Sequence, residues 1–433
     1  MAAETAEAQR EPEAAAPLAP QPALDPLLSG GSSGGIQTFR SLRHREYRLL
    51  WIGTLFSSSG LWIQQVTLGW LIYDLTASAF LLGLINGLRS VPLLVLGPFG
   101  GVAADRFDRK RLMLVTQIGL GLSAAIFATV IVTGHVQVWH VAVFALVSGV
   151  AWAFNMPVRQ SIVPNLVPRS DLMNAMALNS AGFNITRIVG PALAGLMIAK
   201  VGPGENFYIQ AAAYGVVTLL VLQLHLPEIP RGPSRSVMGG LRDGASFVWN
   251  HPTLRTQMTL ALVPVVIALP YISLMPVFAE DVLDVGPGGF GLLMAAPGIG
   301  AVLATLTIAS LGNVEHKGRL LLAAVFALGA SLVLFSLSRN FVLSLAILVL
   351  VGGTQMVYMT TNQTVLQLST PDEYRGRVMG IYMLNQGLLP LGSLFAGTVA
   401  DVFSAPLAVF IMGMLVCTLA ALFAMRSPTI RGL

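Results

Sequence analysis

The stretch Gly101-Val-Ala-Ala-Asp105-Arg106-Phe107-Asp108-Arg109-Lys110-Arg111-Leu112 decides the fold. It separates two long apolar runs, residues 81–104 and 112–132, and it places six charged side chains in a connection too short to form a domain. Such a connection is typical of a tight loop at a membrane surface. Because Lys and Arg beside a hydrophobic span resist translocation, the four cations of this loop predict that it lies in the cytoplasm.

The composition places the chain among integral membrane proteins. Of its 433 residues, 55% are hydrophobic and only 10% are charged, which is outside the usual range of a soluble domain. The isoelectric point of about 9.6 would suggest a nucleic-acid partner if the cations formed one basic face. They are spread through short loops, so we predict no such partner. The single cysteine, Cys417, excludes an internal disulfide and a cysteine-based metal cluster, and we expect no metal and no cofactor.

Twelve spans of about 20 apolar residues fit the chain. They form two groups of six, separated by a polar segment rich in Pro and Gly, within which residues 240–249 could form a short surface helix. The predicted spans are 49–75, 80–104, 112–133, 138–157, 172–199, 207–226, 258–282, 289–311, 320–337, 341–368, 378–400 and 406–425.

This layout predicts an all-α membrane protein in four parts. Residues 1–35 contain no apolar signal-peptide core, so we expect a disordered cytoplasmic tail there. The parts are the tail (1–39), a first six-helix bundle (40–226), a cytoplasmic linker (227–255) and a second six-helix bundle (256–433).

The cations agree with an even number of spans. In this layout 21 of the 25 Lys and Arg, Arg159 among them, fall on the side of the 101–112 loop. Only Lys200 and Arg339 fall on the opposite side, and Arg89 and Arg187 fall within spans. We therefore predict a multi-pass protein of the inner (plasma) membrane with both termini in the cytoplasm.

The two groups of spans also resemble each other in sequence. Gln160, Pro168 and Gly195 realign on Gln363, Pro371 and Gly397 at an offset of 202 or 203 residues. Parallel repeats of this kind place a substrate cavity at the midplane between the halves and allow one half to rock against the other.

Three short motifs resemble those of the major facilitator superfamily. The 101–112 loop is similar to the signature G-x-x-x-D-R-x-G-R-[RK], but it has Asp108 where glycine is usual. Residues 190–195, Gly-Pro-Ala-Leu-Ala-Gly, resemble the end of the motif associated with exporters, and residues 73–76 with 103–106 are similar to the branch of the enterobactin exporter and macrolide efflux proteins. The resemblance covers residues 40–425 and implies the major facilitator fold, twelve transmembrane helices in two six-helix pseudo-repeats. The signature residues are Gly101, Asp105, Arg106, Arg109 and Lys110.

The resemblance implies a gating role for this loop. Asp105, at the end of the second span, could accept hydrogen bonds from the N-terminus of a facing helix in the second half and latch the outward-open state. The alternative is that the loop only anchors the topology. The equivalent position in the second half, residues 312–319, lacks the Asp-Arg pair, so we expect an asymmetric gate.

Gly190, Pro191 and Gly195 lie within the fifth span. A proline in mid-helix would cost a soluble protein several kcal/mol, whereas neighbouring helices can satisfy the freed carbonyl in a membrane. The small residues permit close helix approach. We expect this kink to pack against the eighth span and seal a leak path, or simply to provide small-residue packing.

Arg89 and Arg187 are the two cations predicted within spans. An arginine near the bilayer centre costs about 2.5 to 3.5 kcal/mol on insertion scales, so each should face a polar cavity or a partner. The nearest acids, such as Asp74, lie at span ends. Two hypotheses remain, a structural pairing with backbone or amides such as Asn86 and Asn184, and the binding of an anionic substrate group.

The remaining cavity residues follow from the resemblance, which assigns the lining to the first, fourth, seventh and tenth spans. Aromatic rings with scattered amides make adaptable contacts that suit large amphipathic substrates. The candidates are Ser58, Trp62, Gln65, Trp70, Trp152, Asn155, Tyr271, Gln355, Tyr358, Asn362 and Gln363.

The sequence contains neither a P-loop nor a hydrolase motif, which argues against an ATP-driven pump and an intramembrane enzyme. The leading hypothesis is a monomeric secondary exporter of amphipathic small molecules, such as drugs or a siderophore, coupled to protons. Asp74, Asp105 or Asp401 would have to serve the coupling from the membrane edges. The alternatives are a lysophospholipid or other lipid transporter, whose arginines hold a phosphate, and a non-transporting component of a larger complex.

Overall fold

The computed structural model describes residues 38–226, 237–312, 315–427 and 431. The chain divides into two units, Met1–Thr38 and Phe39–Leu433, and every element described below belongs to the second. The predicted tail (1–39) and part of the predicted linker (residues 227–236) therefore lie largely outside the described residues.

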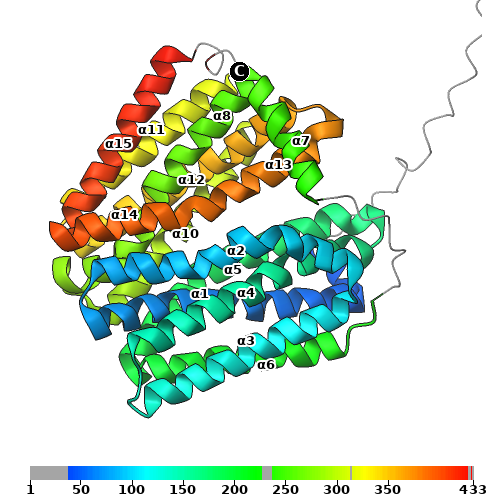
Figure 1. The fold of residues 1–433 in the computed structure, drawn as a ribbon, viewed down its shortest axis with the longest axis vertical. Helices are drawn as coiled ribbons and strands as arrows, with labels where there is room; N and C mark the ends of the chain where they lie inside the picture. The colour runs from blue at the N-terminus through cyan, green and yellow to red at the C-terminus, as the bar shows by residue number, and fades with distance from the viewer. Residues whose placement is uncertain (1–37, 227–236, 313–314, 428–430, 432–433) are drawn as a thin grey trace, which may run out of the picture. The chain divides into compact units, whose positions relative to one another are not determined.

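The described residues are helical and contain no strand, so the prediction of an all-α fold is confirmed (Figure 1). The helices of the first half are α1 (Arg45–Thr76), α2 (Ala79–Arg106), α3 (Arg109–Val132), α4 (Val138–Ile162), α5 (Leu172–Val201) and α6 (Pro203–Leu222). Helix α7 (Val237–Asn250) follows where a short surface helix was expected. The second half contains α8 (Pro252–Val263), η5 (Pro264–Ala268), η6 (Leu269–Leu274), α9 (Met275–Val277), η7 (Phe278–Val282), α10 (Gly286–Leu311), α11 (Lys317–Leu337), α12 (Phe341–Leu368), α13 (Asp372–Asn385), η8 (Gln386–Leu388), α14 (Leu389–Val402) and α15 (Ala405–Arg426).

All twelve predicted spans appear as helical segments. In the described part of the chain, eleven segments are long and apolar enough to cross a membrane. Helix α1 is not among the eleven, although its 32 residues are long enough. It buries Ser57, Ser58, Gln64 and Thr67, and these polar residues lower its hydropathy. A long helix that buries polar groups is suited to the inside of a transporter.

Several helix boundaries differ from the predictions, and those of α6 and α4 have a clear cause. Helix α6 begins and ends four residues early because Gly202, at a φ of 99°, ends α5 and Pro203 starts the next helix. Helix α4 continues through Pro157 to Ile162, although the prediction ended it at the proline. Neighbouring helices tolerate such a proline within a membrane. The assignment of Arg159 to a loop is therefore wrong, because this residue lies on α4.

The seventh predicted span is not one regular helix. It changes from α8 to a π-helix, a 3-10 helix, one α-helical turn and a second π-helix between Pro252 and Val282. Pro264, Pro270 and Pro276 recur every six residues, and each removes a backbone donor from the helix ladder. The eleventh span begins six residues early, at Asp372, and the 3-10 turn η8 interrupts it.

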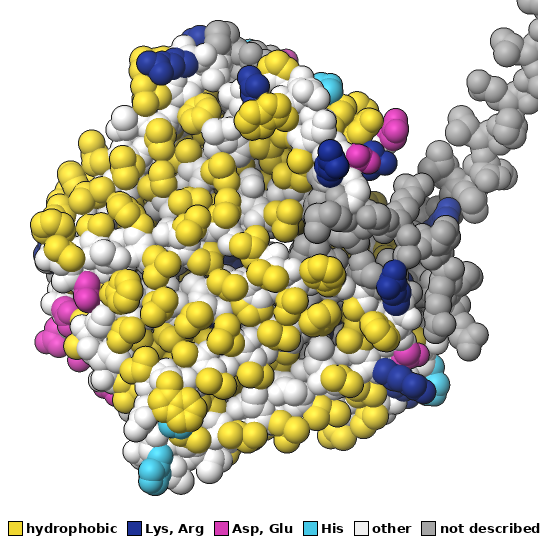
Figure 2. Space-filling model, viewed as in Figure 1, with side chains coloured by type: hydrophobic (Ala, Val, Ile, Leu, Met, Phe, Trp, Pro, Cys, Tyr) yellow, Lys and Arg dark blue, Asp and Glu magenta, His cyan; other side chains and the backbone are white. Residues whose placement is uncertain are grey.

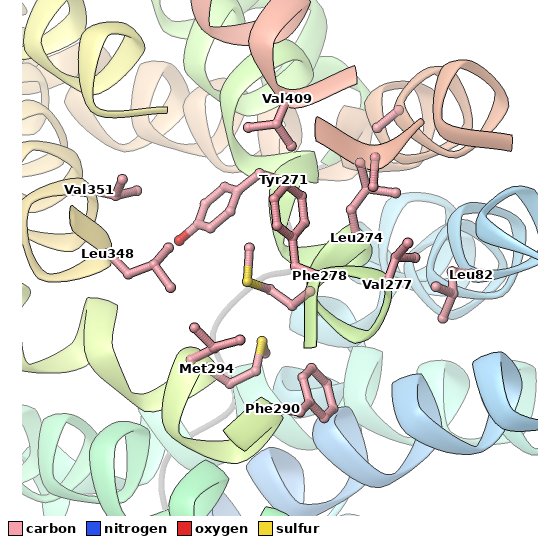
Figure 3. Packing of buried hydrophobic residues seen from close by; sticks show 14 of the residues in the cluster. Leu82, Tyr271, Leu274, Val277, Phe278, Phe290, Met294, Leu348, Val351 and Val409 are labelled. Atoms are coloured by element: carbon pink, nitrogen blue, oxygen red, sulfur yellow. The ribbon is translucent and has the colours of Figure 1, made fainter. Parts of the chain in front are cut away.

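The main hydrophobic core includes residues from both halves. Leu82 of α2 belongs to the same buried cluster as Tyr271, Phe278 and Phe290 of the second half (Figure 3). Tyr271 and Phe278 come from the irregular seventh span, which is the most buried of the apolar segments. This span therefore lies at the centre of the bundle.

The halves approach each other through glycines. Helix α2 packs against α14, and α5 packs against α10. A Cβ atom added to Gly83 would lie 2.2 Å from the carbonyl oxygen of Ser393, and one added to Gly195 would lie 2.5 Å from that of Pro287. Only glycine permits backbones to approach this closely.

The outer surface is apolar across the helices and charged at their ends. Figure 2 shows hydrophobic side chains over most of the visible face, with Lys, Arg and acidic side chains towards the edges. Large side chains such as Val115, Ile126 and Leu306 are more than 60% exposed. A continuous apolar surface of this kind is expected where lipid tails contact a membrane protein.

Candidate gates and substrate path

The two ends of the helices carry different polar contacts. We call the end that contains the 101–112 loop the loop side, and the end that contains the α1–α2 connection the far side. Helices α1 and α2 each run between these two ends.

On the loop side, two cations of the signature motif bind helix C-termini. Arg109 donates from Nη1 to the carbonyl oxygen of Ser161 at 3.3 Å, near the end of α4. Lys110 donates from Nζ to the carbonyl oxygens of Leu222 and Leu224 at 2.8 and 2.7 Å, at the end of α6. A cation is favourable there because the terminal carbonyls lack helical partners and the helix dipole is negative.

Asp108, the residue that departs from the signature, has a local structural role. It is the N-cap of α3, and its Oδ1 accepts a hydrogen bond from the backbone N–H of Arg111 at 2.7 Å. Asp is among the best N-cap residues, so the departure from glycine helps α3 to begin.

The remaining signature residues leave the gate prediction open. Asp105 lies in the last turn of α2, but its side chain is outside the described part of the structure. Arg106 is exposed, and a Cβ added to Gly101 would meet no described atom within 4 Å. The latch between Asp105 and the second half therefore stays a prediction.

The small residues of α5 contact two different helices. A Cβ on Gly195 would lie 2.7 Å from the Cα of Gly291, on the predicted eighth span, and the carbonyl of Pro191 lies against the same glycine. Gly190 instead faces α1, where a Cβ added to this glycine would lie 2.8 Å from the Cβ of Trp62. Pro191 and Gly195 therefore pack against the eighth span, whereas Gly190 does not. The prediction had placed the whole motif against that span.

On the far side, carboxylates of the second half accept hydrogen bonds from the first half. The Tyr73 hydroxyl donates to Asp281 of η7. The backbone N–H of Ala79 donates to Asp401 of α14 at 2.9 Å, and the Ser78 hydroxyl lies 3.4 Å from the same carboxylate. Asp74, a predicted coupling candidate, is exposed at the end of α1.

Arg89 has a side-chain amide partner, as the structural hypothesis expected, but this partner is Gln65 and not Asn86. The side-chain amides of Asn86 and Asn184 donate to carbonyls of their own helices. Arg89 donates from Nη2 to Oε1 of Gln65 on α1 at 2.9 Å. Arg187 lies where α5 meets the second half, since its backbone carbonyl would be 3.4 Å from a Cβ added to Gly298 of α10. The two arginines therefore have different surroundings.

Arg159 is a third arginine within the helices, and the sequence analysis missed it. Its Nη1 donates to the hydroxyl of Thr54 on α1 at 3.0 Å. The signal that could have found it is the apolar pattern that continues past Pro157, since proline does not end a membrane helix as reliably as a soluble one.

Several of the other predicted lining residues have a partner within their own half, several have a buried polar atom without one, and Gln363 is exposed. Asn155 donates to Thr116, Tyr358 donates to the carbonyl of Ala261, and Asn362 accepts from Gln257, so these three have partners within their own halves. In a second group, buried polar atoms have no hydrogen-bond partner among the described residues. This group comprises Trp62 Nε1, Arg89 Nη1, Trp152 Nε1, Tyr271 Oη and Gln355 Oε1, and also Asn155 Oδ1 and Asn362 Nδ2, the second amide atoms of two residues just named.

A separate site lies at the loop side of the second half. A pocket of about 420 Å³ lies between α7 and α13. It is bordered by Asp243 and Phe247 of α7, by His251 just after that helix, and by Tyr374 and Arg377 of α13. The rings of Phe247 and Tyr374 stack at 4.1 Å, and Arg377 lies over Tyr374 at 5.1 Å. These contacts attach the linker helix to α13.

Known proteins match almost the whole described chain. The family model described as "Transmembrane secretion effector" matches residues 36–431. The chain belongs to this family of major facilitator transporters. It is 30% identical to the staphyloferrin A transporter of Staphylococcus aureus, over 83% of this chain and 91% of that one. It is 29% identical to the multidrug efflux pump Tap of Mycolicibacterium fortuitum, over 82% and 88% of the two chains.

A solved transporter structure has the same fold as this chain. The nucleoside transporter NupG superposes with a TM-score of 0.69, covering 88% of this chain and 98% of that one at 15% identity. At this identity the likeness concerns the fold alone. The predicted major facilitator fold with two six-helix halves is confirmed, and the chain is a multi-pass membrane transporter.

Proposed function

We propose that this chain exports small amphipathic organic molecules by alternating access between its two halves. Its relatives are named as a staphyloferrin A transporter and as multidrug efflux pumps.

The observation that carries this proposal is the nature of the contacts between the halves. Gly83 against Ser393 and Gly195 against Gly291 are smooth backbone contacts, and the far-side hydrogen bonds to Asp281 and Asp401 are few. Such contacts can separate when one half rocks, without exposing large interlocked side chains to lipid.

The polar atoms without partners support a substrate path between the halves. Trp62, Tyr271 and Gln355 combine an apolar surface with one buried donor or acceptor each. A substrate that is apolar overall but carries a few polar groups would complete these hydrogen bonds. This combination suits an amphipathic molecule better than a fully polar one.

We further propose that the loop side is cytoplasmic and that the protein acts as a monomer in the plasma (inner) membrane. The cations of the 101–112 loop support this orientation through the positive-inside rule. Export would then move substrate from the loop side to the far side.

Proton coupling is the second part of the proposal. The far-side acids Asp74, Asp281 and Asp401 are exposed at the ends of the helices. Protonation of Asp281 or Asp401 from the far side would weaken its hydrogen bonds to the first half and favour opening on that side. Acidity on the far side would thereby favour release of substrate there, as expected of an exporter coupled to an inward proton gradient.

Flux in proteoliposomes tests the proposal. The full chain is reconstituted, and uptake of the cationic dye ethidium and of an uncharged amphipathic dye into vesicles with the loop side outward is followed with and without a pH gradient. We expect accumulation against the dye gradient only when the lumen is acidic. No flux of either dye by correctly folded protein would contradict export, and flux that ignores the gradient would contradict proton coupling.

The gate at Asp105 has a matched control three residues away. Asp105→Asn should abolish accumulation while leaving expression and dye binding intact. Asp108→Asn changes the same charge but retains an excellent N-cap, so its transport should remain close to that of the original chain. Equal activity of both variants would contradict the gating role.

A further inference from the structure

One face of α1 contacts two arginines of the first half. Arg159 of α4 donates to Thr54, and Arg89 of α2 donates to Gln65. Eleven residues separate Thr54 from Gln65, which is close to three whole turns, so both project from the same face about 16 Å apart along the axis. Ser58 lies one turn beyond Thr54 on this face and is buried. The arginines therefore mark the two polar ends of a stripe along α1 that also carries Leu61 and Trp62.

Neither guanidinium group is satisfied by the protein. Nη1 of Arg89 and both Nε and Nη2 of Arg159 are buried without a hydrogen-bond partner among the described residues. Thr54 and Gln65 are neutral, so each supplies one acceptor and no compensating charge. A buried cation left in this condition is strongly unfavourable unless an anion completes its surroundings.

Among the described side chains, no carboxylate pairs with either arginine. Neither arginine takes part in any ion pair found in the described ranges, where the ion pairs involve residues at the ends of helices. The charge compensation would have to come from outside the chain. Arginine binds carboxylate groups through two parallel N–H donors, and each of these side chains retains buried donors to do so.

The distance along α1 between the two acceptors, Thr54 and Gln65, indicates what kind of anion could bind both arginines. Tyr214 of α6 packs against α1 at Gly60, where its hydroxyl would lie 3.4 Å from an added Cβ. The two guanidinium groups bind acceptors whose Cα atoms are three helical turns apart on α1, a separation that one carboxylate or phosphate does not span. Two acid groups on one flexible molecule could reach both.

We propose that Arg89 and Arg159 form two oxyanion subsites for one elongated organic substrate that carries a carboxylate at each end. This assignment rests on the proposed export function and narrows its substrate class. The Arg159 subsite is nearer the loop side, and the Arg89 subsite lies deeper in the first half. The apolar spacer of the substrate would lie along the α1 face between them.

Binding of a diacid series tests this assignment. The full chain in lipid nanodiscs is titrated with hexanedioate, decanedioate and tetradecanedioate, and with the monoacid tetradecanoate, while intrinsic tryptophan fluorescence is recorded. We expect affinity to rise with the separation of the two carboxylates. Tetradecanedioate should bind about tenfold or more tightly than tetradecanoate, since the second charged contact contributes free energy of its own.

The variants make the outcome specific. Arg89→Gln and Arg159→Gln should each reduce the affinity for tetradecanedioate to that for the monoacid, whereas Lys200→Gln, which removes an exposed cation, should leave it unchanged. Because an unpaired buried charge is removed, both arginine variants should melt at a higher temperature than the original chain when no ligand is present. A purely structural role would lower the melting temperature instead.

Two results would overturn the assignment. One is equal affinity for diacid and monoacid, and the other is unchanged diacid binding in both arginine variants. If ethidium accumulation persists in the original chain while the diacids fail to bind, the subsites are wrong and export stands. If ethidium accumulation fails while the diacids bind with the expected length dependence, the subsites stand and the export mechanism is wrong.

Discussion

Asp401 of α14 accepts a hydrogen bond from the backbone N–H of Ala79, the first residue of α2, at 2.9 Å. A carboxylate of one half thus faces the N-terminus of a helix in the other half, where the helix dipole favours negative charge. This is the arrangement that the signature motif predicts for Asp105 on the loop side. The structure shows it on the far side, with a different residue.

Asp401→Asn should therefore loosen the far side. A charge at a helix N-terminus contributes about 0.3 to 1 kcal/mol, so closure should weaken by roughly two- to fivefold. Hydrogen–deuterium exchange of peptides covering residues 78–84 and 397–404 would increase by a similar factor. Asp74→Asn, which neutralises an exposed acid at the same end, should leave this exchange unchanged. Equal effects of the two substitutions would argue for general electrostatics.

Gly83→Ala should interfere with the contact between α2 and α14. The new methyl group would lie 2.2 Å from the carbonyl oxygen of Ser393, so the two backbones must separate. Overpacking of this kind costs about 1 to 3 kcal/mol and should sharply reduce ethidium accumulation. The matched control is Gly215→Ala in α6, where a Cβ meets no described atom within 4 Å and the helix should gain up to about 1 kcal/mol. Normal transport by Gly83→Ala would contradict this role.

Lys110→Ala should destabilise the first half without a direct effect on substrate binding. It leaves the carbonyls of Leu222 and Leu224 without their cation, at a cost of about 0.5 to 1.5 kcal/mol. Thermal unfolding in detergent, followed by circular dichroism, would show a lower midpoint. Arg111→Ala removes an exposed cation one residue away and should shift the midpoint much less. The reverse order would show that loop charge, rather than capping, sets the stability.

Asp108 allows a test of the departure from the family signature. Replacement of an N-cap Asp by Ala costs about 1 kcal/mol, whereas replacement by Gly costs only a few tenths. Asp108→Gly, which restores the usual residue of the motif, should therefore unfold close to the original midpoint, and Asp108→Ala should unfold earlier. Identical midpoints for the two variants would show that the cap at α3 contributes nothing measurable.

Much of the fold could be predicted because its signals are local. A span needs only about 20 apolar residues in succession, and the described part of the chain contains helical segments at all twelve predicted places. The cation-rich connection at residues 101–112 and the polar segment before α8 likewise depend on neighbouring residues alone. The errors occurred at prolines, since the prediction ended α4 at Pro157 and treated 258–282 as one regular helix.

The candidate site could be predicted only in part. Gln65, Trp62, Tyr271 and Arg89 were named from the sequence, and the structure places polar atoms of these residues among buried groups. Asn155 and Tyr358 were named on the same grounds but have partners within their own halves. Residue type indicates that a polar group within a span needs a partner, but it does not identify which partner.

The sequence by itself determined that this protein is a twelve-span membrane transporter of two similar halves, because hydropathy, span length and motif residues act over short stretches of chain. Only the tertiary structure decided that Arg159 joins Arg89 on one face of α1 and that Asp401 meets Ala79. Those contacts join residues more than 20 positions apart on different helices. They depend on how the helices cross and rotate against one another, which is set by packing that no local pattern encodes.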